Sequence, residues 1–250
     1  MILTVAFGKG GTGKTSTAAA LANRAKDLGR RVLSVDCDPQ ANFTFALGGN
    51  PAAPGLFAVL TGQTRATDVI QHTQQTDLIS AGRDLFAAEG YLINLDTRAR
   101  EFVLNQALKP LRGLYDLIIL DTQPAVNMLL YNALTLSDSV ILPMQANSFA
   151  FMGLYQMQMT IDHIRQGTNP ALTVAGIVLT RYKPRQTLAN DLKAAIEDQA
   201  RQMGTKVYNT YIREGVAVEQ AQALRQSIFS YAPNSNPAND YKALFDEMAL

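Results

Sequence analysis

Eight consecutive residues near the amino terminus have the types and spacing of a phosphate-binding loop. They read Gly8-Lys-Gly-Gly-Thr-Gly-Lys-Thr15 and fit the pattern G-x-x-x-x-G-K-[ST]. Glycines let backbone N–H groups approach phosphate oxygens, and the helix expected to follow points its positive end at them. Lys14 would neutralise β- and γ-phosphate charge, and the Thr15 hydroxyl would bind Mg²⁺. The residues expected to contact a nucleotide here are Gly10, Gly11, Thr12, Gly13, Lys14, Thr15 and Ser16.

Carboxylates follow two apolar segments that we expect to be strands. Asp121 ends the run 117–120, where a Walker B carboxylate would orient a water bound to Mg²⁺. Asp36 and Asp38 follow the segment 31–35 in the same way. The carboxyl ends of parallel strands form the edge at which α/β proteins bind ligands. One of these two could position the attacking water and the other hold the shell of the metal, but spacing alone does not assign the roles. The candidates for the metal site are Thr15, Asp36 and Asp121.

The elements that must position these residues alternate between strands and helices along the chain. The run 117–120 and the segment 174–179 are almost continuously apolar, which is typical of strands buried on both faces of a parallel sheet. Strands are expected at 2–7, 31–35, 117–120, 139–143, 173–180 and 206–212. Helices are expected from Gly13 or Lys14 to a cap at Gly29, and then at 98–111, 148–166, 187–202, 216–225 and 238–248. The pattern predicts an α/β fold of the P-loop NTPase type, with a mostly parallel sheet flanked by helices.

Length and composition limit the other possibilities. A chain of 250 residues suits one α/β domain, and we expect a single domain over residues 1–250. The 22 Lys and Arg nearly cancel the 21 Asp and Glu, which argues against a protein that coats nucleic acid through bulk charge and leaves a local patch open. The single cysteine, Cys37, excludes an internal disulfide framework.

The pattern at the start of the chain bears on its location and organisation. The sequence has no run of about 18 apolar residues, so we expect no transmembrane helix, and it has no secretory signal. Residue 2 already begins the first expected strand, so we expect no DNA-reading module ahead of the nucleotide site.

Six motifs in this order resemble those of the ParA/MinD group of deviant Walker A ATPases, and specifically the ParA-type partition ATPases. The resemblance covers almost the whole chain. The motifs are Lys9-Gly-Gly-Thr-Gly-Lys-Thr15, Val35-Asp-Cys-Asp-Pro-Gln-Ala-Asn42, Leu120-Asp-Thr-Gln-Pro124, Asn132-Ala-Leu134, Val140-Ile-Leu-Pro-Met-Gln145 and Gly176-Ile-Val-Leu-Thr180.

The resemblance implies roles for individual residues around Mg-ATP. Lys9 would be the signature lysine, which reaches across a dimer interface to the partner's nucleotide. Asp38 would position the hydrolytic water, and Asp121 would be the Walker B residue. Thr180 and Arg181 resemble the family's adenine-side contacts. The implied catalytic set is Lys9, Lys14, Asp38 and Asp121, with hydrolysis slow until a dimer and a partner complete the site.

The resemblance also implies partners. ATP would produce a homodimer that binds duplex DNA without sequence preference, through Arg181, Lys183, Arg185 and Arg213. The sequence departs from the family pattern at the last of these, because Glu214 aligns with the family's second basic position and Arg213 with the preceding proline. A ParB-like protein or a cargo adaptor would stimulate hydrolysis and release. The implied location is the cytoplasm, on the nucleoid.

Two other functions fit the same scaffold. A MinD-like ATPase would require a C-terminal amphipathic segment with basic residues for membrane binding, whereas residues 241–250 hold one lysine against two acids, which favours no membrane partner. A metabolic enzyme on this scaffold is the second alternative. The single cysteine argues against an iron–sulfur reductase, but the motifs do not distinguish an ATPase from a ligase that uses ATP to activate a carboxylate.

Overall fold

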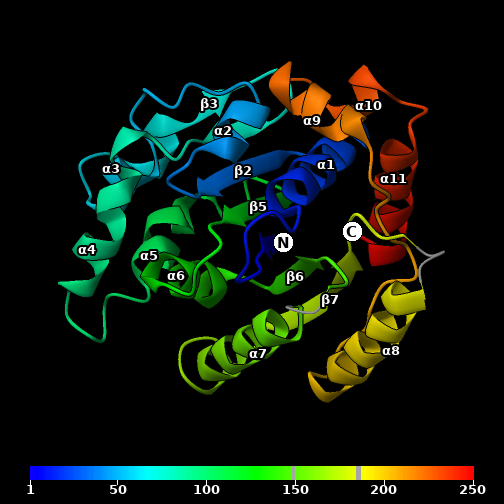
Figure 1. Cartoon of the computed structure of the whole chain (residues 1–250). Helices are drawn as coiled ribbons and strands as arrows, with labels where there is room; N and C mark the ends of the chain where they lie inside the picture. The colour runs from blue at the N-terminus through cyan, green and yellow to red at the C-terminus, as the bar shows by residue number, and fades with distance from the viewer. Residues whose placement is uncertain (148–149, 184–186) are drawn as a thin grey trace.

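A seven-stranded sheet forms the middle layer of the chain in the computed structural model, which describes residues 1–147, 150–183 and 187–250 (Figure 1). The strand order is β3-β4-β2-β5-β1-β6-β7. Every neighbouring pair is parallel except β3 and β4, which pair antiparallel at one edge. The strands are β1 (Ile2–Val5), β2 (Val32–Cys37), β3 (Gln71–His72), β4 (Asp77–Ile79), β5 (Leu117–Thr122), β6 (Ser139–Met144) and β7 (Thr173–Leu179).

Helices cover both faces of this sheet (Figure 1). The α-helices are α1 (Lys14–Asp27), α2 (Asn42–Ala46), α3 (Leu56–Leu60), α4 (Ala88–Ile93), α5 (Val103–Leu108), α6 (Met128–Leu136), α7 (Ala150–Gln166), α8 (Thr187–Gln202), α9 (Val216–Ala223), α10 (Ile228–Tyr231) and α11 (Asn236–Met248). Three short 3₁₀ helices are η1 (Ala66–Val69), η2 (Arg83–Ala87) and η3 (Lys109–Leu111). No helix in the described ranges is long and apolar enough to cross a bilayer.

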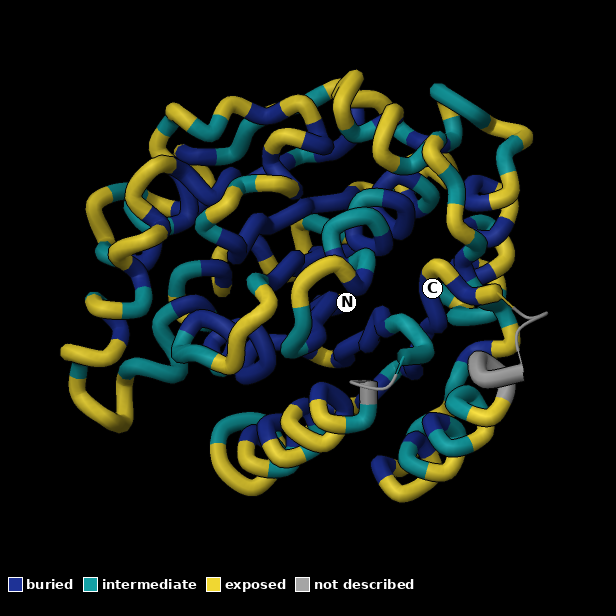
Figure 2. Tube along the Cα trace, in the orientation of Figure 1, coloured by how far each residue is buried: buried dark blue, intermediate teal, exposed yellow. Residues whose placement is uncertain are grey.

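The core forms because successive strand residues point to opposite faces. On β5, Leu117 and Ile119 pack with α1, α10 and α11, whereas Ile118 and Leu120 pack with α3, α5 and α6 on the other face. A third cluster joins β6 and β7 to α7 and α8. The buried trace runs through the sheet and the exposed trace lies on the outer sides of the helices (Figure 2). The near-continuous apolar strands are therefore buried on both faces, as the sequence predicted.

Two glycines in the left-handed region mark the start and the end of the helix after the phosphate loop. Gly13 adopts the left-handed region (φ 85°), and α1 begins at the next residue, Lys14. Its interior is rich in alanine, the strongest helix former. Gly29 (φ 82°) ends it, and the N–H of Arg30 donates to the carbonyl of Ala25. The predicted cap at Gly29 is confirmed.

Five predicted strands correspond to β1, β2, β5, β6 and β7, but the strand predicted at 206–212 is wrong. That segment makes only isolated bridges, from Val207 to Ile177 on β7 and from Ile212 to Thr180 directly after β7. Between them, the N–H groups of Asn209 and Thr210 donate to the Glu247 carboxylate on α11, both at 2.8 Å. These N–H groups do not pair with β7, so the segment 206–212 does not form a continuous strand along it.

Other differences lie where the sequence pattern is weak. The edge strands β3 and β4 are only two and three residues long, and no periodicity announces them. The helix predicted at 98–111 shortens to α5 and the short 3₁₀ helix η3, and the N–H of Leu104 in the first turn of α5 donates to the amide oxygen of Asn132 at 3.0 Å. The apolar helix α6 was not predicted.

Candidate nucleotide and magnesium site

The predicted phosphate loop connects the carboxyl end of β1 to α1. Gly11 (φ 74°) and Gly13 (φ 85°) occupy the left-handed region that favours glycine. The Lys14 ammonium donates to the carbonyl of Lys9 at 3.0 Å, so it points back over the loop. Lys9 itself is half-buried. The Thr180 hydroxyl at the end of β7 donates to the carbonyl of Thr12 at 2.8 Å and ties the loop to the far strand.

Asp121 lies beside the loop because β5 pairs with β1 in parallel register. The Thr15 hydroxyl donates to its Oδ2 at 2.6 Å. The other oxygen, Oδ1, is buried and has no hydrogen-bond partner among the described residues. Burial, followed by the negative charge of Asp36, raises the pKa of Asp121 well above its usual value. Burial lowers the pKa of Lys14, against the opposing charges of Asp121 and Asp38.

This arrangement fits Mg²⁺. A buried carboxylate oxygen without a partner, next to a hydroxyl, supplies the hard oxygen donors that Mg²⁺ prefers. In the described part of the chain, no group of three or more His, Cys, Asp or Glu residues could hold a metal alone. Thr15 and Asp121 would therefore hold the ion together with phosphate oxygens and water, which is common for Mg²⁺.

The two carboxylates after β2 have different surroundings. Asp36 Oδ2 accepts from the N–H and the hydroxyl of Thr44 on α2, both at 2.7 Å, and Oδ1 accepts from the N–H of Asp38 at 3.1 Å. Burial raises the pKa of Asp36 to about 6. Asp38 is 6% exposed, and its Oδ1 accepts the N–H of Gln40 at 2.9 Å. Asp36 thus anchors α2, whereas Asp38 lines the cavity over the loop.

Two adjoining cavities lie over the loop. One of about 480 Å³ is lined by residues 10–16, by Asp38 and by side chains of α2 and α9. The other, about 900 Å³, lies between residues 180–183 and 212–216. Gly13, Ser16, Arg181 and Glu219 line both cavities. A nucleotide with its phosphates in the smaller cavity would place its base in the larger one, next to Thr180 and Arg181.

Sequence reasoning missed several residues of these cavities. Glu219 and Gln222 on α9 face the phosphate side, and the Gln222 amide donates to the Ser16 hydroxyl at 3.2 Å. The Gln145 amide donates to the carbonyl of Gly11 at 2.8 Å. Gln145 stood within a recognised motif, which was a usable signal. No sequence signal connects α9 to a loop about 200 residues earlier.

The predicted basic residues that the structure describes are all paired with carboxylates. Arg181, in the left-handed region (φ 49°), forms an ion pair with Glu219 at 3.0 Å, and Lys183 pairs with Glu214 at 3.0 Å. Both pairs are exposed. Arg213 donates from Nε and Nη2 to Asp240, whose side chain is 11% exposed. Arg185 lies outside the described residues.

Comparison with known proteins identifies the family to which this chain is similar. A family model for an AAA domain matches residues 1–174. The chain is 34% identical to the chromosome-partitioning ATPase Soj of Thermus thermophilus, covering 96% of this chain and 92% of that protein. It is 35% identical to the chromosome partitioning protein ParA of Caulobacter vibrioides, covering 92% and 86% of the two chains.

Solved structures extend the comparison to the fold. The structure of cobyrinic acid a,c-diamide synthase from Mycobacterium smegmatis with bound ADP and magnesium has a TM-score of 0.85 and 31% identity, covering 98% of this chain and 92% of that one. Apo McdA from Cyanothece has a TM-score of 0.85 at 24% identity, over 97% and 98%, and supports the fold alone. The site geometry thus occurs in a chain similar to proteins that bind ADP and magnesium and to partition ATPases.

Proposed function

The chain belongs to the ParA/Soj family of partition ATPases, and we propose that it is an ATP-switched dimer that moves DNA or another cargo. It is a Mg²⁺-dependent ATPase of the partition or positioning kind. The proposal adds the switch. ATP produces a homodimer that loads on non-specific double-stranded DNA, and a ParB-like protein or cargo adaptor stimulates hydrolysis and release. It takes residues 1–250 as one ATPase domain acting in the cytoplasm on the nucleoid.

The main support for the proposal is that Lys14, Thr15 and Asp38 line one cavity, and that Asp121 lies directly behind it, hydrogen-bonded to Thr15. In the proposed reaction, Lys14 neutralises phosphate charge, and Thr15 and Asp121 hold Mg²⁺. Asp38 orients the attacking water. Asp36, whose oxygens are occupied by Thr44 and Asp38, supports the metal site from behind. These steps require positioning and charge rather than covalent chemistry.

In the proposed function, Lys9 of each subunit completes the catalytic site of the other subunit, which is why rapid hydrolysis requires the dimer. Lys14 completes the phosphate pattern without Lys9, because only the second lysine is required by G-x-x-x-x-G-K-[ST]. A second lysine supplied by the partner subunit would place positive charge next to the phosphate oxygens, where negative charge develops in the transition state. One chain alone would then hydrolyse ATP slowly.

Beside the larger cavity, the basic side chains proposed to bind DNA are paired with carboxylates in the free chain. Arg181–Glu219 and Lys183–Glu214 are exposed pairs, each worth roughly 0–1 kcal/mol, so DNA phosphates could replace the carboxylates. Arg213 is bound more firmly to Asp240 and would contribute less. Two copies in a dimer would double the number of contacts.

The direct test is binding to a random-sequence DNA duplex with ATP, ADP or no nucleotide, across a salt series. We expect binding with ATP alone, falling steeply with salt because counterions are released. Lys183→Ala should weaken binding and reduce the salt slope by about 2, because one phosphate contact is lost from each subunit of the dimer. Arg98→Ala, which removes an exposed charge that lines neither cavity, is the matched control. Equal binding in all nucleotide states, or none in any, would contradict the proposal.

A second candidate function follows from the likeness to the Mycobacterium smegmatis synthase. An ATP-dependent amide synthase activates a carboxylate, so ADP would form only with a carboxylic acid substrate. Cys37 could not serve as a nucleophile in such a reaction, because burial, followed by the charge of Asp36, raises the pKa of its thiol well above the usual value. ADP formation by the purified chain with no added carboxylic acid decides for the ATPase.

A further inference from the structure

A single buried amide joins three helices that surround the phosphate cavity. Gln75, in the short turn between β3 and β4, is 7% exposed. Its Nε2 donates to the carbonyl of Ala46 at 2.8 Å and to that of Arg225 at 3.0 Å. Its Oε1 accepts from the Asn23 amide on α1 at 2.9 Å. Ala46 ends α2 and Arg225 follows the end of α9, so the amide satisfies carbonyls that these helices leave unpaired.

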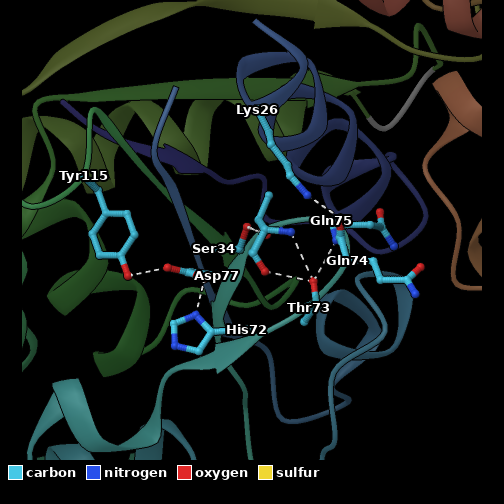
Figure 3. Close-up of polar contacts among 9 residues, drawn as sticks. Lys26, Ser34, His72, Thr73, Gln74, Gln75, Asp77 and Tyr115 are labelled. Carbon is cyan, nitrogen blue, oxygen red and sulfur yellow. Dashed lines mark hydrogen bonds and ion pairs between the residues drawn. The ribbon is translucent and has the colours of Figure 1, made fainter. Parts of the chain in front are cut away.

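The turn that carries Gln75 is itself held rigidly (Figure 3). The Thr73 hydroxyl accepts the N–H groups of Gln75 and Thr76, both at 3.1 Å, and donates to the carbonyl of Thr76. Thr76 shares a hydrogen bond with Ser34 on β2 at 3.0 Å, and the Lys26 ammonium on α1 donates to the carbonyl of Gln74. The side chain of Gln75 therefore extends from a fixed base.

The helices joined by this amide form the outer wall of the phosphate cavity. Asn42 and Phe45 line it from α2, and Glu219 and Gln222 line it from α9. A second contact bridges the same helices, because the Arg225 guanidinium lies 4.5 Å from the centroid of the Phe45 ring. Gln75 and Arg225 thus fix α2 against α9.

The position of α2 governs Asp38. The carbonyl of Asp38 accepts the N–H of Ala41 at 2.9 Å, and Ala41, in the left-handed region (φ 57°), leads directly into α2. Thr44 on the same helix anchors Asp36, whose Oδ1 accepts the N–H of Asp38. A shift of α2 would move the backbone that presents the Asp38 carboxylate.

We infer that Gln75 is a positioning residue for ATP hydrolysis: its amide holds α2 and α9 together and thereby fixes Asp38 over the phosphate cavity. The inference rests on the role of Asp38 in the proposed function. Gln75 lies behind the wall and lines neither cavity. Its loss should therefore reduce kcat, while the phosphate loop, and with it ADP binding, stays intact.

The test is Gln75→Met, which keeps the length of the side chain and removes its amide group. We expect kcat at saturating ATP to fall about tenfold or more, as small misplacements of catalytic groups do. The Kd for ADP, measured by calorimetry, should stay unchanged. Hydrogen exchange of the amides of Phe45 on α2 and of Leu47 directly after it should accelerate. Gln74→Met, at the exposed neighbouring position, is the matched control and should leave all three quantities unchanged.

A second variant separates positioning from stability. Arg225 occupies the left-handed region (φ 55°), which glycine tolerates better. Arg225→Gly should thus keep or raise the thermal midpoint while it removes the contact with Phe45, and kcat should fall. An unchanged kcat in folded Gln75→Met, or in Arg225→Gly if the first does not fold, overturns the inference. So does a loss of ADP affinity parallel to kcat. Asp38→Ala separates the two proposals, because wild-type turnover in that variant refutes the role of Asp38 itself.

Discussion

Two buried aspartates stand side by side on neighbouring strands, yet their environments give them different tasks. Asp36 and Asp121 are paired in the register of β2 and β5, and both are fully buried. Asp36 accepts three hydrogen bonds, whereas Asp121 accepts one at Oδ2 and, from the residues that the structure describes, none at Oδ1. An unsatisfied buried carboxylate is costly for the fold. That cost is expected where a cation is to bind.

Asp121→Asn should separate stability from function. Removing the buried carboxyl should raise the free energy of unfolding at pH 7 by about 1–3 kcal/mol, because burial raises its pKa and the chain must either keep the charge in the core or take up a proton on folding. The same change should abolish the gain in ATP affinity that Mg²⁺ provides, since an amide is a poorer ligand than a carboxylate. Denaturant unfolding and calorimetry with and without Mg²⁺ measure the two effects. Lys14→Ala, expected to lose nucleotide binding altogether, serves as the binding-deficient control.

At the scale of elements, β7 and the segment 206–212 meet through a contact that requires glycine. Gly176 has φ 155°, and a Cβ there would lie 2.5 Å from the Tyr208 ring. Tyr208 is 3% exposed, and its hydroxyl donates to the carbonyl of Ala175 at 2.7 Å, so the ring has little freedom to move.

Gly176→Ala should therefore destabilise the protein by about 2–3 kcal/mol through overpacking. Gly90→Ala is the matched control, because a Cβ at this helical position meets nothing within 4 Å. The control should be neutral or stabilising by roughly 0.5–1 kcal/mol. Urea denaturation of both variants checks the pair, and equal midpoints for the two would refute the packing argument.

The same segment is held to α11 by Glu247, and this contact depends on pH. Burial alone would raise the pKa of Glu247, but the N–H groups of Asn209 and Thr210 outweigh it and the pKa lies below its usual value. The folded state therefore binds this proton less tightly than the unfolded state. The contribution is complete above the unfolded pKa of about 4.3 and is lost as pH falls through the folded pKa.

Glu247→Gln should consequently lower the free energy of unfolding at pH 7, by at most about 1 kcal/mol after solvent screening. The difference from wild type should shrink as the pH is lowered below about 4. Thermal unfolding across this pH range measures it. A difference that is constant with pH would show that the carboxylate charge is not what binds the segment.

Across the whole molecule, the sequence predicted the position of a site residue where that residue lies at the end of a helix or strand with a clear apolar pattern. Lys14 and Thr15 begin α1 and Asp121 lies near the end of β5, so spacing and apolar pattern predicted the parallel strands and brought these residues to the same edge of the sheet. The antiparallel edge was not predictable, because β3 and β4 are too short to show alternation.

The cavity wall was likewise beyond prediction, for a topological reason. Gln222 reaches Ser16 from 206 residues away, and Gln75 joins Asn23, Ala46 and Arg225 across three helices. Such contacts depend on how the helices pack on the sheet, and no local spacing encodes them. The residues proposed to bind Mg-ATP can therefore be found from local motifs, whereas the residues that position them are visible only in the folded structure.

In the proposed function, ATP switches this chain between one copy and two. The decisive measurement is the molar mass in solution of Asp38→Ala, which should bind ATP without turning it over. We predict a mass twice the 27.2 kDa of one chain with Mg-ATP, and 27.2 kDa with ADP or no nucleotide. Lys9→Ala, added to this variant, should restore the single-chain mass. A mass of 27.2 kDa with saturating Mg-ATP bound, or a dimer in every nucleotide state, would contradict the account.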